Sequence, residues 1–245
     1  MMPAGTEIAL MLSIIFISTM ARSTFGFGDA LIAMPLLALV VPVSTATPLI
    51  ALIAVIISTS ILIRNWRLAK APGALPLIIF SIIGIPVGLI YLREAAEDVV
   101  KIVLASIIIL FSIYKLANPK LLTIKNEKLS FAFGLLAGML GGAYNTNGPP
   151  IIIYGTLRGW EPDRFRAILQ AIFLPTNIFI VIGHGIAGFW SQTVIFSFLF
   201  ALPVVIIGIF LGGRLNKRIP AEKFTKYIYI FLIIIGVVLL VNTVA

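Results

Sequence analysis

Two short polar interruptions in an otherwise apolar sequence contain the residues best suited to binding chemistry. The first runs from Arg22 to Asp29 and the second from Gly141 to Pro150. Their glycines permit positive φ angles and let a ligand approach the main chain closely, and Pro149 and Pro150 suit the first turn of a helix. A helix that begins at such a break directs free N–H groups and the positive end of its dipole towards the break. The two breaks therefore predict a binding site for a small anion.

The side chains at the breaks add neutral donors and two opposite charges to this predicted site. The planar guanidinium of Arg22 could bind an anion directly. Asp29 could neutralise Arg22 when the site is empty, or it could take up and carry a proton. We expect the following residues to bind the substrate: Arg22, Ser23, Gly26, Gly28, Asn145, Thr146, Asn147 and Gly148.

The same residues also have a structural interpretation. The glycines could serve only the tight packing of membrane helices. Arg22 and Asp29 could form a structural ion pair, or Arg22 could extend to a membrane interface. An ionisable residue buried in a membrane costs roughly 2.5–3.5 kcal/mol, however, and is by default a candidate for function. The sequence leaves both interpretations of this pair open.

Polar residues of the apolar segment 167–183 are placed to face the same site. Gln170 and Asn177 are seven positions apart, so they share one face of a helix. We expect them to line the cavity and reach the substrate, and hydrogen bonding between helices is the alternative. His184, the only histidine, directly follows this segment. It is expected in a solvated turn at the outer end of the helix.

The composition indicates a membrane protein. The 245 residues are 60% hydrophobic and 11% charged, whereas soluble domains have about 25% charged residues. The net charge of +9 fits basic cytoplasmic loops, so no nucleic-acid partner is expected. With no cysteine and one histidine, the chain can form no disulfide, thiolate nucleophile or His/Cys metal cluster. Hydrolase and metalloprotease motifs are missing as well, so we expect no enzymatic activity, metal or cofactor.

Ten apolar segments would position the two breaks. Four of them form two pairs, 8–21 with 30–41 and 129–143 with 149–157, and each pair flanks one break. Because these segments look too short to cross a hydrocarbon core of about 30 Å, each pair is expected to form a re-entrant or broken-helix hairpin with its tip buried in protein. The other six are long enough to span: 45–63, 74–92, 99–117, 167–183, 193–212 and 225–243.

The distribution of Lys and Arg predicts how these elements cross the membrane. Two hairpins would place the main basic regions on one face, which the positive-inside rule makes cytoplasmic. Each half would then cross the membrane an odd number of times, so the halves would be inverted and both termini would lie outside. The basic regions are 64–70, 115–128, 158–166 and 214–226.

The two halves also match locally in sequence. The stretch from Gly84 to Gly88, followed by a charged turn, resembles the stretch from Gly208 to Gly212. We therefore expect an all-α, polytopic transmembrane protein with two inverted repeats, each made of one hairpin and three spanning helices. The repeats are residues 1–117 and 129–245, and a cytoplasmic linker covers 118–128.

The motifs at the breaks resemble those of one family of membrane transporters. Gly26-Phe27-Gly28-Asp29-Ala30 is followed by Pro35-Leu36, and Gly134 and Gly138 lead to Gly148-Pro149-Pro150. This pattern resembles the sulfite exporter TauE/SafE family, also called the toluene sulfonate uptake permeases. The resemblance implies transport of small sulfur-containing anions such as sulfite, sulfoacetate and other organosulfonates.

The predicted function is that of a secondary transporter in the cell (plasma or inner) membrane. An anion would bind near the midplane between the two re-entrant loops, and the halves would expose it alternately to either side. A passive anion channel is the closest alternative, and an intramembrane enzyme is a more distant one. The expected partners are a small anionic substrate and the lipid bilayer. The sequence leaves open whether two copies form a homodimer.

Overall fold

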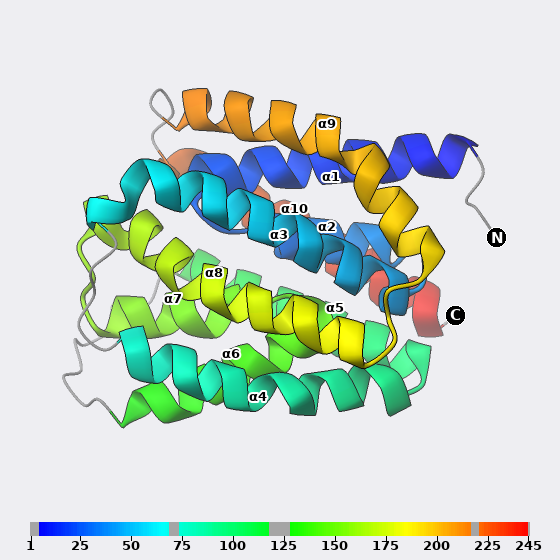
Figure 1. The fold of residues 1–245 in the computed structure, drawn as a ribbon, viewed down its shortest axis with the longest axis horizontal. Helices are drawn as coiled ribbons and strands as arrows, with labels where there is room; N and C mark the ends of the chain where they lie inside the picture. Colours follow the sequence, from blue (N-terminus) through cyan, green and yellow to red (C-terminus); the bar gives the residue numbers. More distant parts are fainter. Residues whose placement is uncertain (1–4, 69–73, 118–127, 217–220, 245) are drawn as a thin grey trace.

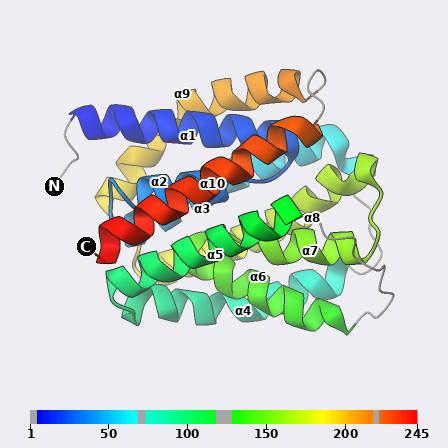
Figure 2. The same ribbon diagram turned by 180° about the vertical axis from the view of Figure 1, so that it is seen from behind.

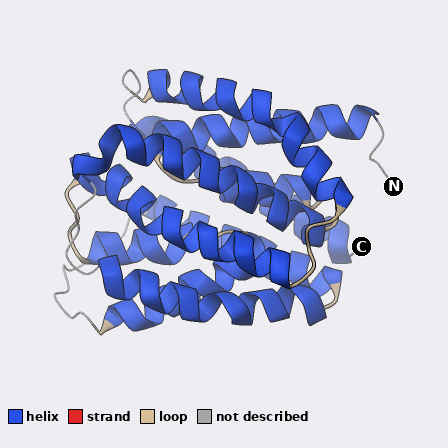
Figure 3. Ribbon diagram, in the orientation of Figure 1, coloured by secondary structure: helices blue, strands red, loops and turns tan. Residues whose placement is uncertain are grey.

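The helices account for almost all of the chain in the computed structural model, which describes residues 5–68, 74–117, 128–216 and 221–244. Within these ranges there is no strand (Figures 1 and 3). The predicted all-α class is therefore confirmed. The elements are α1 (Gly5–Phe25), α2 (Asp29–Leu37), α3 (Val43–Asn65), the 3-10 turn η1 (Trp66–Leu68), α4 (Ala74–Glu94), α5 (Glu97–Ala117), α6 (Leu129–Tyr144), α7 (Gly148–Leu157), α8 (Pro162–Ile186), α9 (Gln192–Leu215) and α10 (Ala221–Val244).

Seven helices in the described part of the chain are long and apolar enough to cross a membrane. Six of them, α3, α4, α5, α8, α9 and α10, contain the predicted spanning segments. The seventh is α1: segment 8–21, which looked too short to cross, lies in a helix of 21 residues that is long enough. The helix continues through Arg22 and Thr24, since both side chains find hydrogen-bond partners inside the protein.

Two breaks of three residues each separate a longer helix from a short one. Gly26–Gly28 separates α1 from α2, and Asn145–Asn147 separates α6 from α7. Gly26, Gly28 and Asn145 have φ angles of 88°, 102° and 52°, a left-handed region that glycine adopts freely and asparagine tolerates. With 9 and 10 residues, α2 and α7 are too short to span a membrane, as the sequence predicted.

The helices pack in pairs that join the two halves of the sequence. α1 packs along α9, α4 along α6, α3 along α8, and α5 along α10. α3 and α8 lie on the near side in Figure 1, and α5 and α10 lie on the near side of the reversed view in Figure 2. The start of α1 and the end of α10 lie towards one end of the bundle. At the other end are Arg64 in the last turn of α3 and Arg214 in the last turn of α9, and we call this the basic end.

Glycines hold the paired helices at close range. A Cβ atom at Gly88 would stand 2.0 Å from a carbonyl oxygen of α6, and one at Gly142 would stand 2.4 Å from a carbonyl oxygen of α4. A Cβ atom at Gly212 would likewise stand 2.6 Å from a carbonyl oxygen of α1. These glycines serve helix packing. Gly141 and Gly142 were expected within the second break, but they lie in α6 with no positive φ.

Candidate functional site

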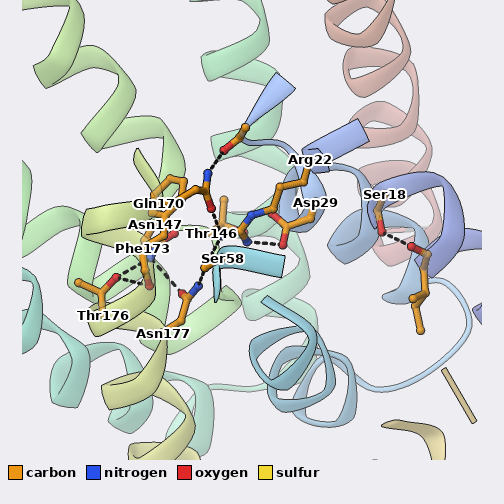
Figure 4. A network of polar contacts seen from close by, with 12 residues as sticks. Ser18, Arg22, Asp29, Ser58, Thr146, Asn147, Gln170, Phe173, Thr176 and Asn177 are labelled. Atoms are coloured by element: carbon orange, nitrogen blue, oxygen red, sulfur yellow. Dashed lines mark hydrogen bonds and ion pairs between the residues drawn. The ribbon is translucent and has the colours of Figure 1, made fainter. Parts of the chain in front are cut away.

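The centre of the candidate site is an ion pair between the two ends of the first break. Arg22 lies in the last turn of α1 and Asp29 is the first residue of α2. Arg22 Nη1 donates to Asp29 Oδ2 at 2.5 Å (Figure 4). Arg22 is 3% exposed and Asp29 is 6% exposed, so the two charges compensate each other away from water. A charge left alone here would be strongly disfavoured.

Side chains of α3 and α8 complete the surroundings of the guanidinium. Arg22 Nη2 donates to Ser58 Oγ at 2.5 Å and to Gln170 Oε1 at 3.2 Å. The guanidinium lies over the ring of Phe173, with Cζ 5.1 Å from the ring centroid. At this distance the face of the ring attracts a cation. Arg22 Nε has no hydrogen-bond partner although it is buried. The guanidinium therefore retains one free donor inside the protein.

The second break is connected to the same network through its last residue. Asn147 Nδ2 donates to Thr176 Oγ1 at 3.2 Å and to Asn177 Oδ1 at 3.3 Å. Asn177 Nδ2 in turn donates to Ser58 Oγ at 3.5 Å, the oxygen that also accepts from Arg22. Figure 4 shows this chain of contacts running from α1 to α8. The two breaks, 116 or more residues apart in sequence, thus share one buried polar cluster.

Asn145 differs from the other polar residues at the breaks because its amide is unpaired. Its side chain is 2% exposed, and neither Oδ1 nor Nδ2 has a hydrogen-bond partner. The hydroxyl of Ser23 is also buried and unpaired, whereas Thr146 Oγ1 donates to the carbonyl of Tyr144 at 3.0 Å. Unpaired buried amides are rare and require an explanation. A ligand at the break would supply one.

The two breaks lie at different depths along α8. Gln170 Nε2 donates to the carbonyl of Gly26 at 2.6 Å, so Gln170 marks the level of the first break, whereas Asn177 marks the level of the second. Seven residues of α-helix correspond to about 10 Å. Both residues face the cluster and form hydrogen bonds between helices there, and their contact with a substrate stays a prediction. The breaks are thus bridged by Arg22, Ser58 and Asn177 rather than touching at their tips.

The two remaining predicted residues, Gly28 and Gly148, have no side chain and are described by their backbone conformation and surroundings. Gly28 adopts a positive φ and faces open space, because a Cβ atom there would meet nothing within 4 Å. Gly148 begins α7, and a Cβ atom there would lie 3.8 Å from the ring of Phe173. The space beside Gly28 is an apolar pocket lined by residues of α1, α2 and α10, whereas Gly148 is in ordinary contact distance of Phe173.

Sequence reasoning missed two members of the cluster and misplaced a third residue. Ser58 and Phe173 lie in apolar spanning segments and were not singled out. The only signal in the sequence was that Ser58 is a polar residue within a segment predicted to span the membrane. His184 was expected in a solvated turn, but it is 0% exposed. Its Nε2 lies 3.1 Å from the carbonyl oxygen of Gly142, and its ring packs edge-on against Phe189. The helix α8 continues past it to Ile186, which keeps it inside the protein.

These features define a polytopic helical membrane protein with a polar site buried between two broken helices, the architecture typical of secondary transporters. Residues 10–239 match the model of the family described as sulfite exporter TauE/SafE, and the chain belongs to that family. A protein of Cupriavidus necator (strain H16), described as a "Probable sulfite/organosulfonate exporter TauE", is 24% identical over 229 residues, which cover 89% of this chain and 87% of that protein. No solved structure matches the chain.

Membership of the family confirms three predictions made from the sequence. The resemblance to TauE/SafE proteins was correct, and it covers most of the chain. The protein is a transporter and not an enzyme, because the family is one of exporters. Together with the seven candidate spans in the described residues, the family also makes this a multi-pass protein of the cell membrane.

Proposed function

We propose that this protein is a secondary transporter of small sulfur-containing anions, such as sulfite or an organosulfonate, and that it works by alternating access. The observation that carries the proposal is the buried Arg22–Asp29 pair and its link through Ser58 to the second break. A buried guanidinium beside the N-termini of two short helices suits a small oxyanion. The C. necator relative is described as an exporter of sulfite or organosulfonates, which supports the same class of substrate.

In this proposal Arg22 is the main ligand of the anion and Asp29 is its counter-ion in the empty site. Asp29 Oδ2 accepts a hydrogen bond from Nη1 of the guanidinium, and an oxygen of the substrate would take its place as acceptor. Nδ2 of Asn145 and the hydroxyl of Ser23 have no other partner, so they remain available as donors near the breaks. The other expected contacts surround or support this position: Gly26, Gly28, Thr146, Asn147, Gly148, Gln170 and Asn177.

The membrane potential favours export of such a substrate. An anion that moves to a positive exterior releases about 2.3 kcal/mol per charge per 100 mV, so export needs no coupling ion. Import would need one. Asp29 is the acid that contacts Arg22, and its protonation would release the guanidinium for the anion. Proton-coupled uptake through Asp29 is therefore the form that import would take.

We further propose that residues 1–117 and 129–245 are inverted repeats joined by a cytoplasmic linker at 118–128, most of which lies outside the described residues. The helix pairing supports this, because exchanging α1–α5 for α6–α10 converts the α1–α9 pair into the α6–α4 pair. The same exchange leaves the α3–α8 and α5–α10 pairs unchanged. The matched glycines support it too: Gly88 packs on the carbonyl of Met139 in α6, and Gly212 packs on the carbonyl of Met20 in α1.

A passive anion channel is the second candidate within transport. A conducting pore keeps its charged lining in contact with water, or closes it with an apolar constriction. Arg22 at 3% and Asp29 at 6% exposure are instead paired with each other and shut off from both ends. This burial favours an occluded site and hence alternating access.

The proposal is tested by transport assays with purified protein in proteoliposomes. Uptake and efflux of sulfite, sulfoacetate, taurine and thiosulfate are measured with and without a pH gradient. We expect Arg22→Gln to lower the rate about tenfold or more, because one charged hydrogen-bonding group is lost from the site. Arg93→Gln is the matched control, since Arg93 is exposed beside Glu94, and it should transport at the normal rate.

Three outcomes would count against the proposal. If none of the four anions is bound or moved, the substrate class is wrong. If Arg22→Gln and Asn147→Ala both retain the normal rate, the site is wrong. If flux rises linearly with concentration and no counterflow is seen, the protein is a channel and alternating access is wrong.

A further inference from the structure

The last carbonyl groups of α1 are bound by two side chains that the proposed substrate site does not use. The final carbonyls of a helix have no partner within it. Here Arg166 Nη2 donates to the carbonyl of Ser23, and Asn216 Nδ2 donates to the carbonyl of Thr24 at 2.5 Å. Arg166 Nη1 also donates to Asn216 Oδ1 at 2.7 Å. The two side chains therefore act as one unit that ties the end of α1 to α8 and α9.

This unit lies between the buried site and the basic end. Arg166 is half-buried near the start of α8, and Asn216 is exposed at the C-terminal end of α9. Gln170, one helical turn further into α8, binds Gly26 and Arg22. Cγ of Arg166 also lies 2.6 Å from the place where a Cβ of Gly26 would be. The side chain of Arg166 thus covers the first break on its basic side.

The second break is bound in the same way at the opposite end. The carbonyls of Gly142 and Ala143 hold the same positions before that break as those of Ser23 and Thr24 hold before the first. His184 Nε2 lies 3.1 Å from the carbonyl oxygen of Gly142, and Thr47 Oγ1 donates to the carbonyl of Ala143 at 3.3 Å. His184 is 18 residues from Arg166 along α8, a separation of about 27 Å.

We propose that Arg166 and Asn216 form the gate at the basic end of the protein, and that His184 and Thr47 close the opposite end. Opening towards the basic end then requires release of Ser23 and Thr24 by Arg166 and Asn216, while the bonds at the other end persist. The proposal rests on the transport function proposed above. It makes Arg166 a positioning residue that holds α1, and its charge lies near that of Arg64 at the basic end.

Sided labelling of one introduced cysteine tests this gate. The chain has no cysteine of its own, and Ser23→Cys places a thiol at a buried hydroxyl that has no partner. Its reaction with a membrane-impermeant methanethiosulfonate is followed in inside-out and in right-side-out vesicles. In the Ser23→Cys background, Arg166→Gln should raise the labelling rate from the basic face about tenfold, the factor expected for loss of one charge-assisted hydrogen bond. From the opposite face the rate should stay the same.

Matched variants separate a gate from a general loosening of the fold. Thr47→Val should raise labelling only from the opposite face, and Arg166→Lys should recover most of the slow rate because it keeps the charge and a donor. Arg164→Gln, two residues away and exposed beside Glu161, should change nothing. An unchanged rate in Arg166→Gln, or an equal rise from both faces, would overturn the proposal. Because labelling needs no substrate, a failed transport assay leaves this test intact.

Discussion

The Arg22–Asp29 pair leads to a prediction about stability that does not depend on any substrate. Arg22→Gln removes the guanidinium and leaves the carboxylate of Asp29 buried without its partner at 2.5 Å. Asp29→Asn leaves the guanidinium without its counter-charge. The double variant, Arg22→Gln with Asp29→Asn, removes both charges and keeps side chains of similar size. We expect each single variant to be much less stable than the double variant.

The magnitude follows from what each change leaves unpaired. An uncompensated charge in the middle of a membrane costs about 2.5–3.5 kcal/mol, and removal of one partner of a buried pair costs about 3–5 kcal/mol. Ser58 and Gln170 lose little in Arg22→Gln, because Ser58 still accepts from Asn177 and Gln170 still donates to Gly26. The loss should therefore be about 3 kcal/mol in each single variant. Most of it should return in the double variant. If that variant loses about 1 kcal/mol, the coupling energy between the two charges is about 5 kcal/mol.

Reversible unfolding in mixed detergent micelles measures these differences. The wild type, both single variants and the double variant form one thermodynamic cycle, and Arg93→Gln serves as the control for a surface arginine. If the double variant is no more stable than the single ones, the two charges do not compensate each other and the reasoning fails. Transport should be lost in the double variant even though it folds well, because the ligand for the anion is missing.

Three further predictions concern single side chains. Gly88→Ala would place a Cβ atom 2.0 Å from a backbone oxygen of α6 and should lower stability in detergent by about 1–3 kcal/mol, whereas Gly5→Ala meets nothing within 4 Å and should be neutral. Asn145→Gly keeps the positive φ and deletes two unpaired amide atoms, so stability should hold or rise while KM for the anion rises about tenfold; an unchanged KM would remove Asn145 from the site. Ser58→Ala should cost about 1–3 kcal/mol in unfolding and slow transport, because buried donors lose their acceptor; the control Ser112→Ala removes a buried hydroxyl without a partner and should do neither.

The order of the elements could be predicted because the lengths of the apolar segments distinguish spanning helices from the interrupted pairs. Six apolar segments of spanning length and two interrupted pairs follow directly from the sequence, and so does the grouping of Arg64 and Arg214 at one end. The length of α1 could not be predicted from the same pattern. Arg22 and Ser23 read as the end of an apolar segment, whereas partners on α3 and α8 let the helix continue through them. A short stretch of sequence does not reveal such partners, because they lie on helices distant in the chain.

Membership of the candidate cluster was predictable only where a polar residue stood out from an apolar background. Gln170 and Asn177 stood out, and both face the cluster. Arg166 did not, because it lies in a basic stretch that charge counting assigns to a solvated loop. The structure places it against the carbonyl of Ser23 instead. Contacts between side chains and the carbonyls of a distant helix end depend on how α1 packs against α9, and no residue spacing encodes that packing.

The unequal chemistry of the two breaks follows from the cost of burying charge. Gly141 and Gly148 hold, relative to the second break, the positions that Arg22 and Asp29 hold relative to the first. A second pair would bury two more charges, and a Cβ atom at Gly141 would stand 2.8 Å from Ile180 Cδ1, so that side chain would have to move. In the proposed function one guanidinium attracts one small anion, and the neutral amide of the second break adds a donor without another desolvated charge. We infer that the breaks match in backbone but differ in charge because one binds the anion and the other encloses it.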